Sequence, residues 1–96
     1  MSPAPRHATA IAFGAVLRAA RRERGLSQEA LADLGGLDRT YPSLLERGLR
    51  TPTLSAIFRL ADALGLPAEY LVAKASGLLQ SYGGANPARQ DVAKHR

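Results

Sequence analysis

Residues 17–48 read LRAARRERGLSQEALADLGGLDRTYPSLLERG, and this stretch decides the fold. Its apolar residues recur every three or four positions, which is the spacing of one face of an α-helix. Glycines interrupt this pattern at Gly25, at Gly35 and Gly36, and again at Gly48. Because glycine readily adopts the left-handed turn that ends a helix, the stretch predicts short helices in close succession.

Polar residues stand where these helices would begin. The Ser27 hydroxyl can cap the first turn of the second helix, and Leu26 and Leu31 occupy the two positions of a hydrophobic staple. Asp38 offers a cap for a third short helix that runs through Arg47. Two short helices joined by a tight glycine turn form the helix-turn-helix arrangement, which places one helix in the major groove of DNA.

The flanking sequence completes a helical domain. We expect a first helix over residues 10–24, a fourth capped by Thr53 and ended by Gly65, and a fifth with Pro67 in its first turn. The expected fold is therefore all-α, a compact five-helix domain over residues 10–75. Residues 1–9 are expected to form a flexible basic arm, and residues 76–96 a C-terminal extension for dimerisation followed by a disordered basic tail.

The composition agrees with this and excludes other classes. The 96 residues suit one domain, and 46% hydrophobic content with only 5% aromatics and no Trp favours a helical core of Leu and Ala. Without Cys there is no disulfide, no thiolate zinc site and no Cys nucleophile. His7 and His95 lie near opposite ends of the sequence and cannot make a metal site by themselves. We expect no metal, no cofactor and no enzymatic activity, because no catalytic set or phosphate loop is present.

The net charge of +5 at pH 7 favours polyanionic partners such as nucleic acid. More than half of this positive excess comes from the two ends of the chain. These ends carry one acidic residue, Asp91, and four basic ones: Arg6, Arg89, Lys94 and Arg96. The apolar stretch over residues 8–17 is too short to span a bilayer. We therefore expect a cytoplasmic protein with no membrane partner.

The segment over residues 13–72 resembles the Cro and lambda-repressor-like (XRE-type) family of bacterial and phage DNA-binding domains. The resemblance rests on the stretch quoted above and on PTLSAIFRLADALGL at residues 52–66. Its most specific parts are the Arg-x-x-x-Gly-Leu-Ser-Gln-x-x-Leu-Ala core, the Glu-Arg-Gly that ends the third helix, and the following Pro-Thr-Leu. The resemblance implies a domain that binds double-stranded DNA and lies at the nucleoid of a bacterium or on phage DNA.

The resemblance also implies that the third helix reads the bases. Arg39 is the leading base reader, since arginine binds guanine N7 and O6 with two hydrogen bonds, worth about 1–3 kcal/mol against a wrong base. Leu44 could touch a thymine methyl, and Gln28 resembles the family residue that grips a phosphate and braces the recognition helix. The full expected set of DNA-binding residues is Gln28, Arg39, Thr40, Tyr41, Ser43, Leu44, Arg47 and Arg50.

Simpler interpretations of these residues stay open. The three arginines could form a solvated face, Leu44 could pack against a neighbour or a dimer partner, Thr40 and Ser43 could merely start a helix, and Gln28 could be an ordinary exposed first-turn residue.

Four other positions concern the packing of the domain. Arg21 and Glu46 occupy the family positions of an ion pair between the first and third helices, which we interpret as structural. Ala32 stands where the family keeps a small residue between the two motif helices. Pro42 departs from the family, which has Ile or Val there. Proline is tolerated within a first turn, so we prefer Thr40 to Asp38 as the cap, with Arg39 presented from the turn.

The expected function is a transcriptional regulator, most simply a repressor. Such domains bind an operator inverted repeat as a homodimer, with half-sites about 34 Å apart. The alternatives are an antitoxin or restriction-modification controller subtype, and a protein-interaction module whose recognition face, with Pro42 and Leu44, binds an unknown protein partner. No small-molecule ligand is expected. The fifth helix and the residues after it offer the dimer interface, unless they only close the domain: Tyr70, Val72, Leu78, Leu79 and Tyr82.

Overall fold

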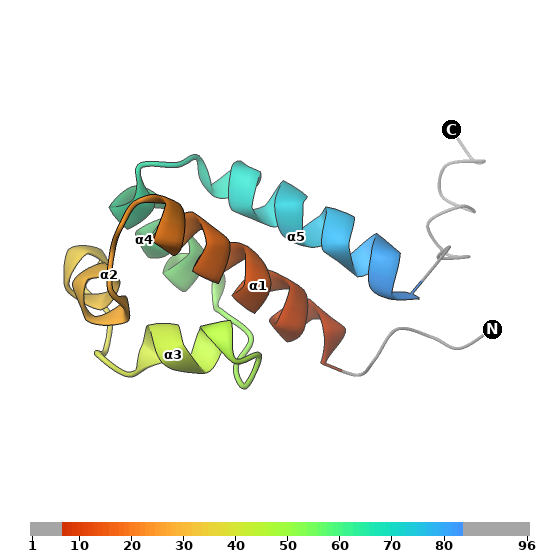
Figure 1. Ribbon diagram of the computed structural model, residues 1–96, viewed down its shortest axis with the longest axis horizontal. Coiled ribbons are helices and arrows are strands. Elements are labelled where there is room, and N and C mark those ends of the chain that lie inside the picture. Colours follow the sequence, from red (N-terminus) through yellow and green to blue (C-terminus); the bar gives the residue numbers. More distant parts are fainter. Residues whose placement is uncertain (1–6, 84–96) are drawn as a thin grey trace.

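Five α-helices form within residues 7–83, the part of the chain that the computed structural model describes (Figure 1). The helices are α1 (Ala8–Glu23), α2 (Gln28–Gly35), α3 (Tyr41–Glu46), α4 (Leu54–Leu64) and α5 (Ala68–Gly83). The all-α fold expected from the sequence is confirmed. No helix among residues 7–83 is both long and apolar enough to cross a membrane.

Two hydroxyl caps start helices where the sequence predicts them. The Ser27 hydroxyl accepts a hydrogen bond of 3.0 Å from the Ala30 amide at the start of α2. The Thr53 hydroxyl does the same for the Ala56 amide at the start of α4, also at 3.0 Å. Each cap satisfies an amide that has no partner within its helix, so both helix starts are fixed locally.

The turn between α2 and α3 depends on Gly36, whose φ is +63°. This left-handed conformation ends α2 and lets the Leu37 amide donate to the Ala32 carbonyl at 2.9 Å. Ala32 is fully buried below this turn, as expected for a small residue at the junction. The chain therefore reverses tightly enough for α3 to pack against α2.

The ends of α1 and α5 differ from the expected bounds. α1 begins at Ala8, two residues earlier than expected, and Ala8 is buried. α5 begins at Ala68, so Pro67 lies just before the helix and not inside its first turn. α5 also continues without a break through position 76 to Gly83. The expected basic arm and tail fall mostly on residues 1–6 and 84–96, which lie outside the described residues.

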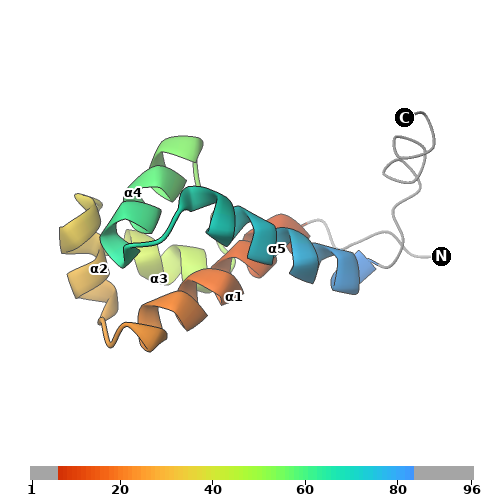
Figure 2. The ribbon, with the colours of Figure 1, turned by 90° about the horizontal axis from the view of Figure 1, so that it is seen from above.

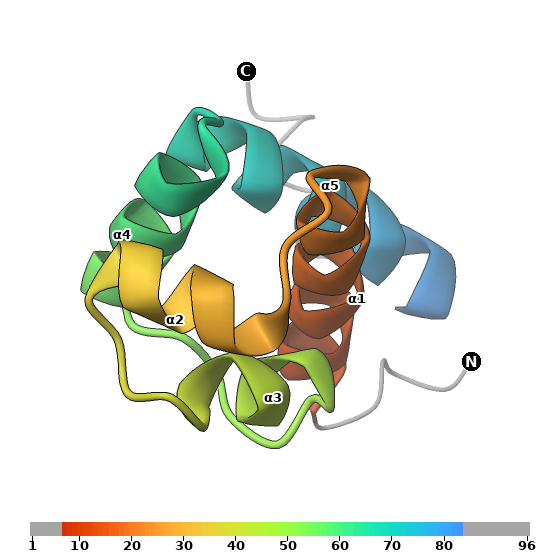
Figure 3. The ribbon, with the colours of Figure 1, turned by 60° about the vertical axis from the view of Figure 1, so that its left-hand side comes forward.

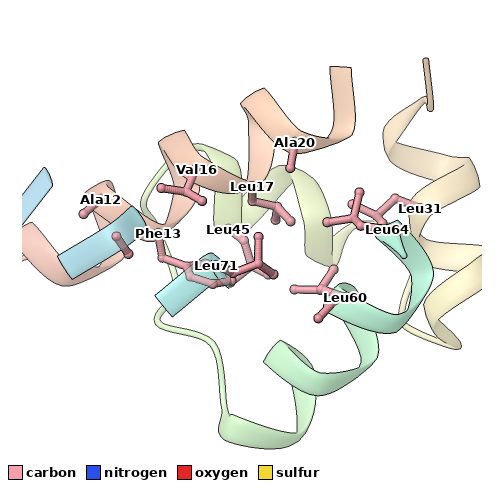
Figure 4. Close-up of a cluster of buried hydrophobic side chains, with 12 residues drawn as sticks. Ala12, Phe13, Val16, Leu17, Ala20, Leu31, Leu45, Leu60, Leu64 and Leu71 are labelled. Atoms are coloured by element: carbon pink, nitrogen blue, oxygen red, sulfur yellow. The ribbon is translucent and has the colours of Figure 1, made fainter. Parts of the chain in front are cut away.

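One fully buried leucine from each helix meets in the core (Figure 4). They are Leu17, Leu31, Leu45, Leu60 and Leu71, in the order α1 to α5. Phe13, Val16, Leu64 and several alanines fill the space around them. Truncation of a core leucine to alanine typically costs about 2–5 kcal/mol, so each helix is held mainly through this shared layer.

The helices surround this core as a closed ring, in the spatial order α1, α5, α4, α2 and α3 (Figure 3). α1 contacts α5 and α3, α2 contacts α3 and α4, and α4 contacts α5. α3 and α5 therefore lie on opposite sides of α1 in Figure 1, and the view from above in Figure 2 shows the end of α5 extending past the other helices. The arrangement separates the α2–α3 surface from the surface of α5.

Gly14 in α1 allows α3 to approach closely. A Cβ at this position would overlap the carbonyl oxygen of Leu45 and lie 3.0 Å from that of Glu46. Both neighbours are backbone atoms at the end of α3, so they cannot move aside as a side chain can. Glycine in the middle of a helix is unfavourable, and the close packing of α3 is the reason for it here.

We predict that Gly14→Ala destabilises the protein by about 1–3 kcal/mol, although alanine is the better helix former. The matched control is Gly77→Ala in α5, where a Cβ meets nothing within 4 Å. That change should stabilise the protein by about 0.5–1 kcal/mol. Urea unfolding of both variants measures the effect, and stabilisation by Gly14→Ala would contradict the close approach of α1 and α3.

Candidate nucleic-acid interface

The carboxylate of Glu46, the last residue of α3, receives hydrogen bonds from two other helices. Arg21 of α1 donates from Nε to Oε2 at 2.6 Å and from Nη2 to Oε1 at 3.0 Å. Gln28 of α2 donates from Nε2 to Oε1 at 3.1 Å. The Glu46 side chain is only 4% exposed and that of Arg21 12%. The sequence-predicted residues Arg21, Glu46 and Gln28 thus form one partly buried polar network that joins three helices.

Arg21 also fixes the chain between α1 and α2. Its Nη1 donates to the carbonyl oxygen of Leu26 at 2.8 Å, in the link that precedes α2. The hydrogen bonds that Arg21 donates to Glu46 raise the pKa of Arg21 above its ordinary value, burial acts in the opposite direction, and the charge of Glu46 adds to the increase. The guanidinium therefore stays charged and keeps both contacts.

The start of α3 agrees with the sequence in the place of Pro42, but Thr40 does not cap it: its φ of −86° and ψ of −11° are helical and not extended. Thr40 is the residue before α3, and Pro42 lies within its first turn. The Thr40 hydroxyl makes no cap hydrogen bond to an amide; it donates to Asp38 Oδ2 at 3.2 Å. Arg39 lies in the turn before the helix. Pro42 is fully buried, so it is not part of a surface that a partner could touch.

The expected DNA-binding residues come from the first turn of α2, the turn that follows it, α3 and the link after α3. Arg39, Thr40, Arg47 and Arg50 are exposed. The half-buried members of the set are Gln28, Tyr41, Ser43 and Leu44. Tyr41 packs partly against the core, so only part of its surface is open to a ligand.

An ion pair that the sequence did not predict joins α2 to the turn before α3. Glu29 accepts from the guanidinium of Arg39, and both side chains are exposed, at 57% and 76%. An acidic residue in the first turn of a helix is favourable by itself, because of the helix dipole, so Glu29 gave no hint of a partner in the sequence.

The expected dimer residues divide into two groups. Tyr70, Val72 and Tyr82 are exposed on α5. Leu78 and Leu79 are partly buried against the core of their own domain. Exposed apolar side chains also occur outside α5, and the sequence analysis did not predict their exposure. The most exposed of them are Leu34, Leu49, Leu54 and Phe58.

Comparison with known proteins gives a match to one family and to a phage repressor. A family model described as helix-turn-helix matches residues 17–71. The immunity repressor protein of Bacillus phage phi105 is 32% identical over 82 residues, which cover 84% of this chain and 57% of the repressor. The chain spans 47% to 60% of the length of four of the curated relatives that it matches.

Two solved structures share the arrangement of helices. The restriction-modification controller protein C.AhdI from Aeromonas hydrophila has a TM-score of 0.63 and 47% identity, over 65% of this chain and 94% of that protein. The controller protein C.Esp1396I was solved as a tetramer in complex with its natural 35 base-pair operator. It has a TM-score of 0.67 and 27% identity, over 74% of this chain and 93% of that one.

We predict that Arg21→Met costs about 3–5 kcal/mol of stability, because it leaves the Glu46 carboxylate buried without its main partner. The double variant Arg21→Met with Glu46→Leu should recover most of this loss, since no buried charge remains. Urea unfolding of both single variants and the double variant measures the coupling between the two residues. Losses in the double variant equal to the sum of the two single losses would contradict the interaction.

Proposed function

Because the chain belongs to the Cro and lambda-repressor-like (XRE-type) family of helix-turn-helix proteins, we propose that it is a sequence-specific DNA-binding transcriptional regulator, most simply a repressor. The observation that carries the proposal is the α2–α3 surface. There the partly buried Glu46 network fixes a six-residue helix, and Arg39 projects into solvent at its start. The role is one of binding, and we propose no catalytic reaction.

The chemistry of this surface suits a DNA groove. Arg39 reads a guanine through N7 and O6, and Leu44, with Ser43 beside it, contacts a neighbouring base such as a thymine through its methyl group. Thr40 and Tyr41 contact the DNA near the start of α3. Arg47, Arg50 and Gln28 bind phosphates, which fixes the orientation of α3 without specifying a sequence. Binding therefore weakens as salt rises, because phosphate contacts release counterions.

We further propose that the protein acts as a homodimer on an inverted repeat. A single domain of this size offers a small contact area, and two domains related by symmetry read two half-sites about 34 Å apart. The exposed α5 residues Tyr70, Val72 and Tyr82, with the partly buried Leu78 and Leu79 beside them, form the proposed dimer surface. A regulator of this kind works in the cytoplasm, at the nucleoid.

The similarity to C.AhdI, at 47% identity, favours one of the proposed subtypes, the restriction-modification controller. A controller of restriction-modification genes would use the same helix-turn-helix domain and the same proposed DNA-binding surface. This subtype is favoured over a protein-interaction module, because Pro42, one of the two residues that suggested such a module, is buried.

We predict that selection from a pool of randomised duplexes recovers an inverted repeat at moderate salt. Arg39→Ala should relax the preference at one symmetric position, because the guanine loses its two hydrogen bonds. Arg18→Ala is the charge-matched control, since Arg18 is an exposed residue of α1 that belongs neither to the proposed DNA-binding set nor to the proposed dimer surface. No enrichment by the wild type, or an equal loss of selectivity in both variants, would contradict the proposed function.

We predict that Val72→Lys converts the dimer to a monomer in sedimentation, because a charge would be buried at the proposed interface. Phe58→Lys is the matched control on α4, because Phe58 is an exposed apolar residue, 56% accessible against 48% for Val72. If Phe58→Lys dissociates the dimer and Val72→Lys does not, the interface lies on α4 and the α5 proposal is wrong.

A further inference from the structure

The ion pair between Glu29 and Arg39 contributes little to the fold. Both side chains are largely exposed, and exposed ion pairs add little stability because water and salt screen them. Ser27 caps the start of α2, and the hydrogen bonds of Glu46 hold the end of α3. Neither helix therefore needs Glu29 to keep its position. A structural role therefore does not account for this contact.

The position of the pair suggests a different role. The first turn of α2 reaches α3 at both of its ends. Gln28 donates to Glu46 at the C-terminal end, and Glu29 holds Arg39 just before the N-terminal end. Two adjacent side chains of α2 thus set where α3 lies and where the guanidinium beside it is held.

A carboxylate at this place opposes DNA binding in general. Phosphates repel it, and it competes with them for the same guanidinium. The carboxylate also restrains the arginine. A side chain already held in one conformation loses less conformational entropy when it makes two hydrogen bonds to a guanine. A carboxylate can also accept a hydrogen bond from cytosine N4, whereas no phosphate can satisfy it.

We propose that Glu29 is a specificity-determining residue that positions Arg39 for a guanine edge and keeps it from binding phosphates. The inference rests on the proposed function, and it adds a residue that increases selectivity while it lowers affinity for DNA of any sequence. Its effect is exerted through Arg39, and it therefore depends on that side chain being present.

The test uses Glu29→Gln, which keeps the size of the side chain and removes its charge. Dissociation constants are measured at one moderate salt concentration on the operator selected by the wild type and on a random duplex of equal length. Binding of Glu29→Gln to the random duplex should tighten. The ratio of random to operator dissociation constants should fall by about fivefold or more, which corresponds to the lower range for one base contact.

Two controls separate this role from charge and from folding. Glu69→Gln in α5 changes the net charge equally and should leave the ratio unchanged. In an Arg39→Ala background, Glu29→Gln should also leave the ratio unchanged, because its effect passes through Arg39. The urea midpoint of Glu29→Gln should match that of the wild type.

The two proposals fail in different ways. If the wild type selects an operator and Glu29→Gln keeps the wild-type ratio, the role of Glu29 is overturned and the proposed function stands. The same holds if Glu69→Gln lowers the ratio as much as Glu29→Gln does. If the wild type selects no operator, the proposed function fails, and the role of Glu29 fails with it.

Discussion

The arrangement of the α2–α3 surface depends on one buried carboxylate, that of Glu46. A charge removed from water is tolerated only with good partners, and the Arg21 guanidinium and the Gln28 amide supply three N–H donors to it. Because these donors come from α1 and α2, satisfying the charge fixes the end of α3 relative to both helices. A purely apolar contact would bury the same surface without requiring one orientation.

This constraint matters because α3 cannot hold itself. With six residues it is far shorter than an isolated helix that is stable in water. Its geometry comes from its neighbours: Leu45 enters the shared leucine layer, Gly14 admits its backbone against α1, and Glu46 closes the polar network. A helix that reads bases needs this rigidity, because a shift of the helix would weaken all of its contacts with the bases at once.

The features that depend on neighbouring residues in the chain could be predicted from the sequence. The caps at Ser27 and Thr53 and the place of Pro42 in the first turn of α3 are examples, because each follows from local turn chemistry. The close approach at Gly14 and the contact of Glu29 with Arg39 could not be predicted, since each depends on how separate helices pack. The candidate base readers were named from a family resemblance, and their roles stay predictions.

The central claim is that the α2–α3 surface, held by Glu46, is the side that meets DNA. The most direct measurement is an amide NMR titration of the protein with a short duplex that carries one selected half-site. The account predicts that shift changes concentrate in the first turn of α2, in the turn around Arg39 and in α3, while α5 changes little. Changes concentrated on α5 or α4, with α3 unaffected, would contradict it.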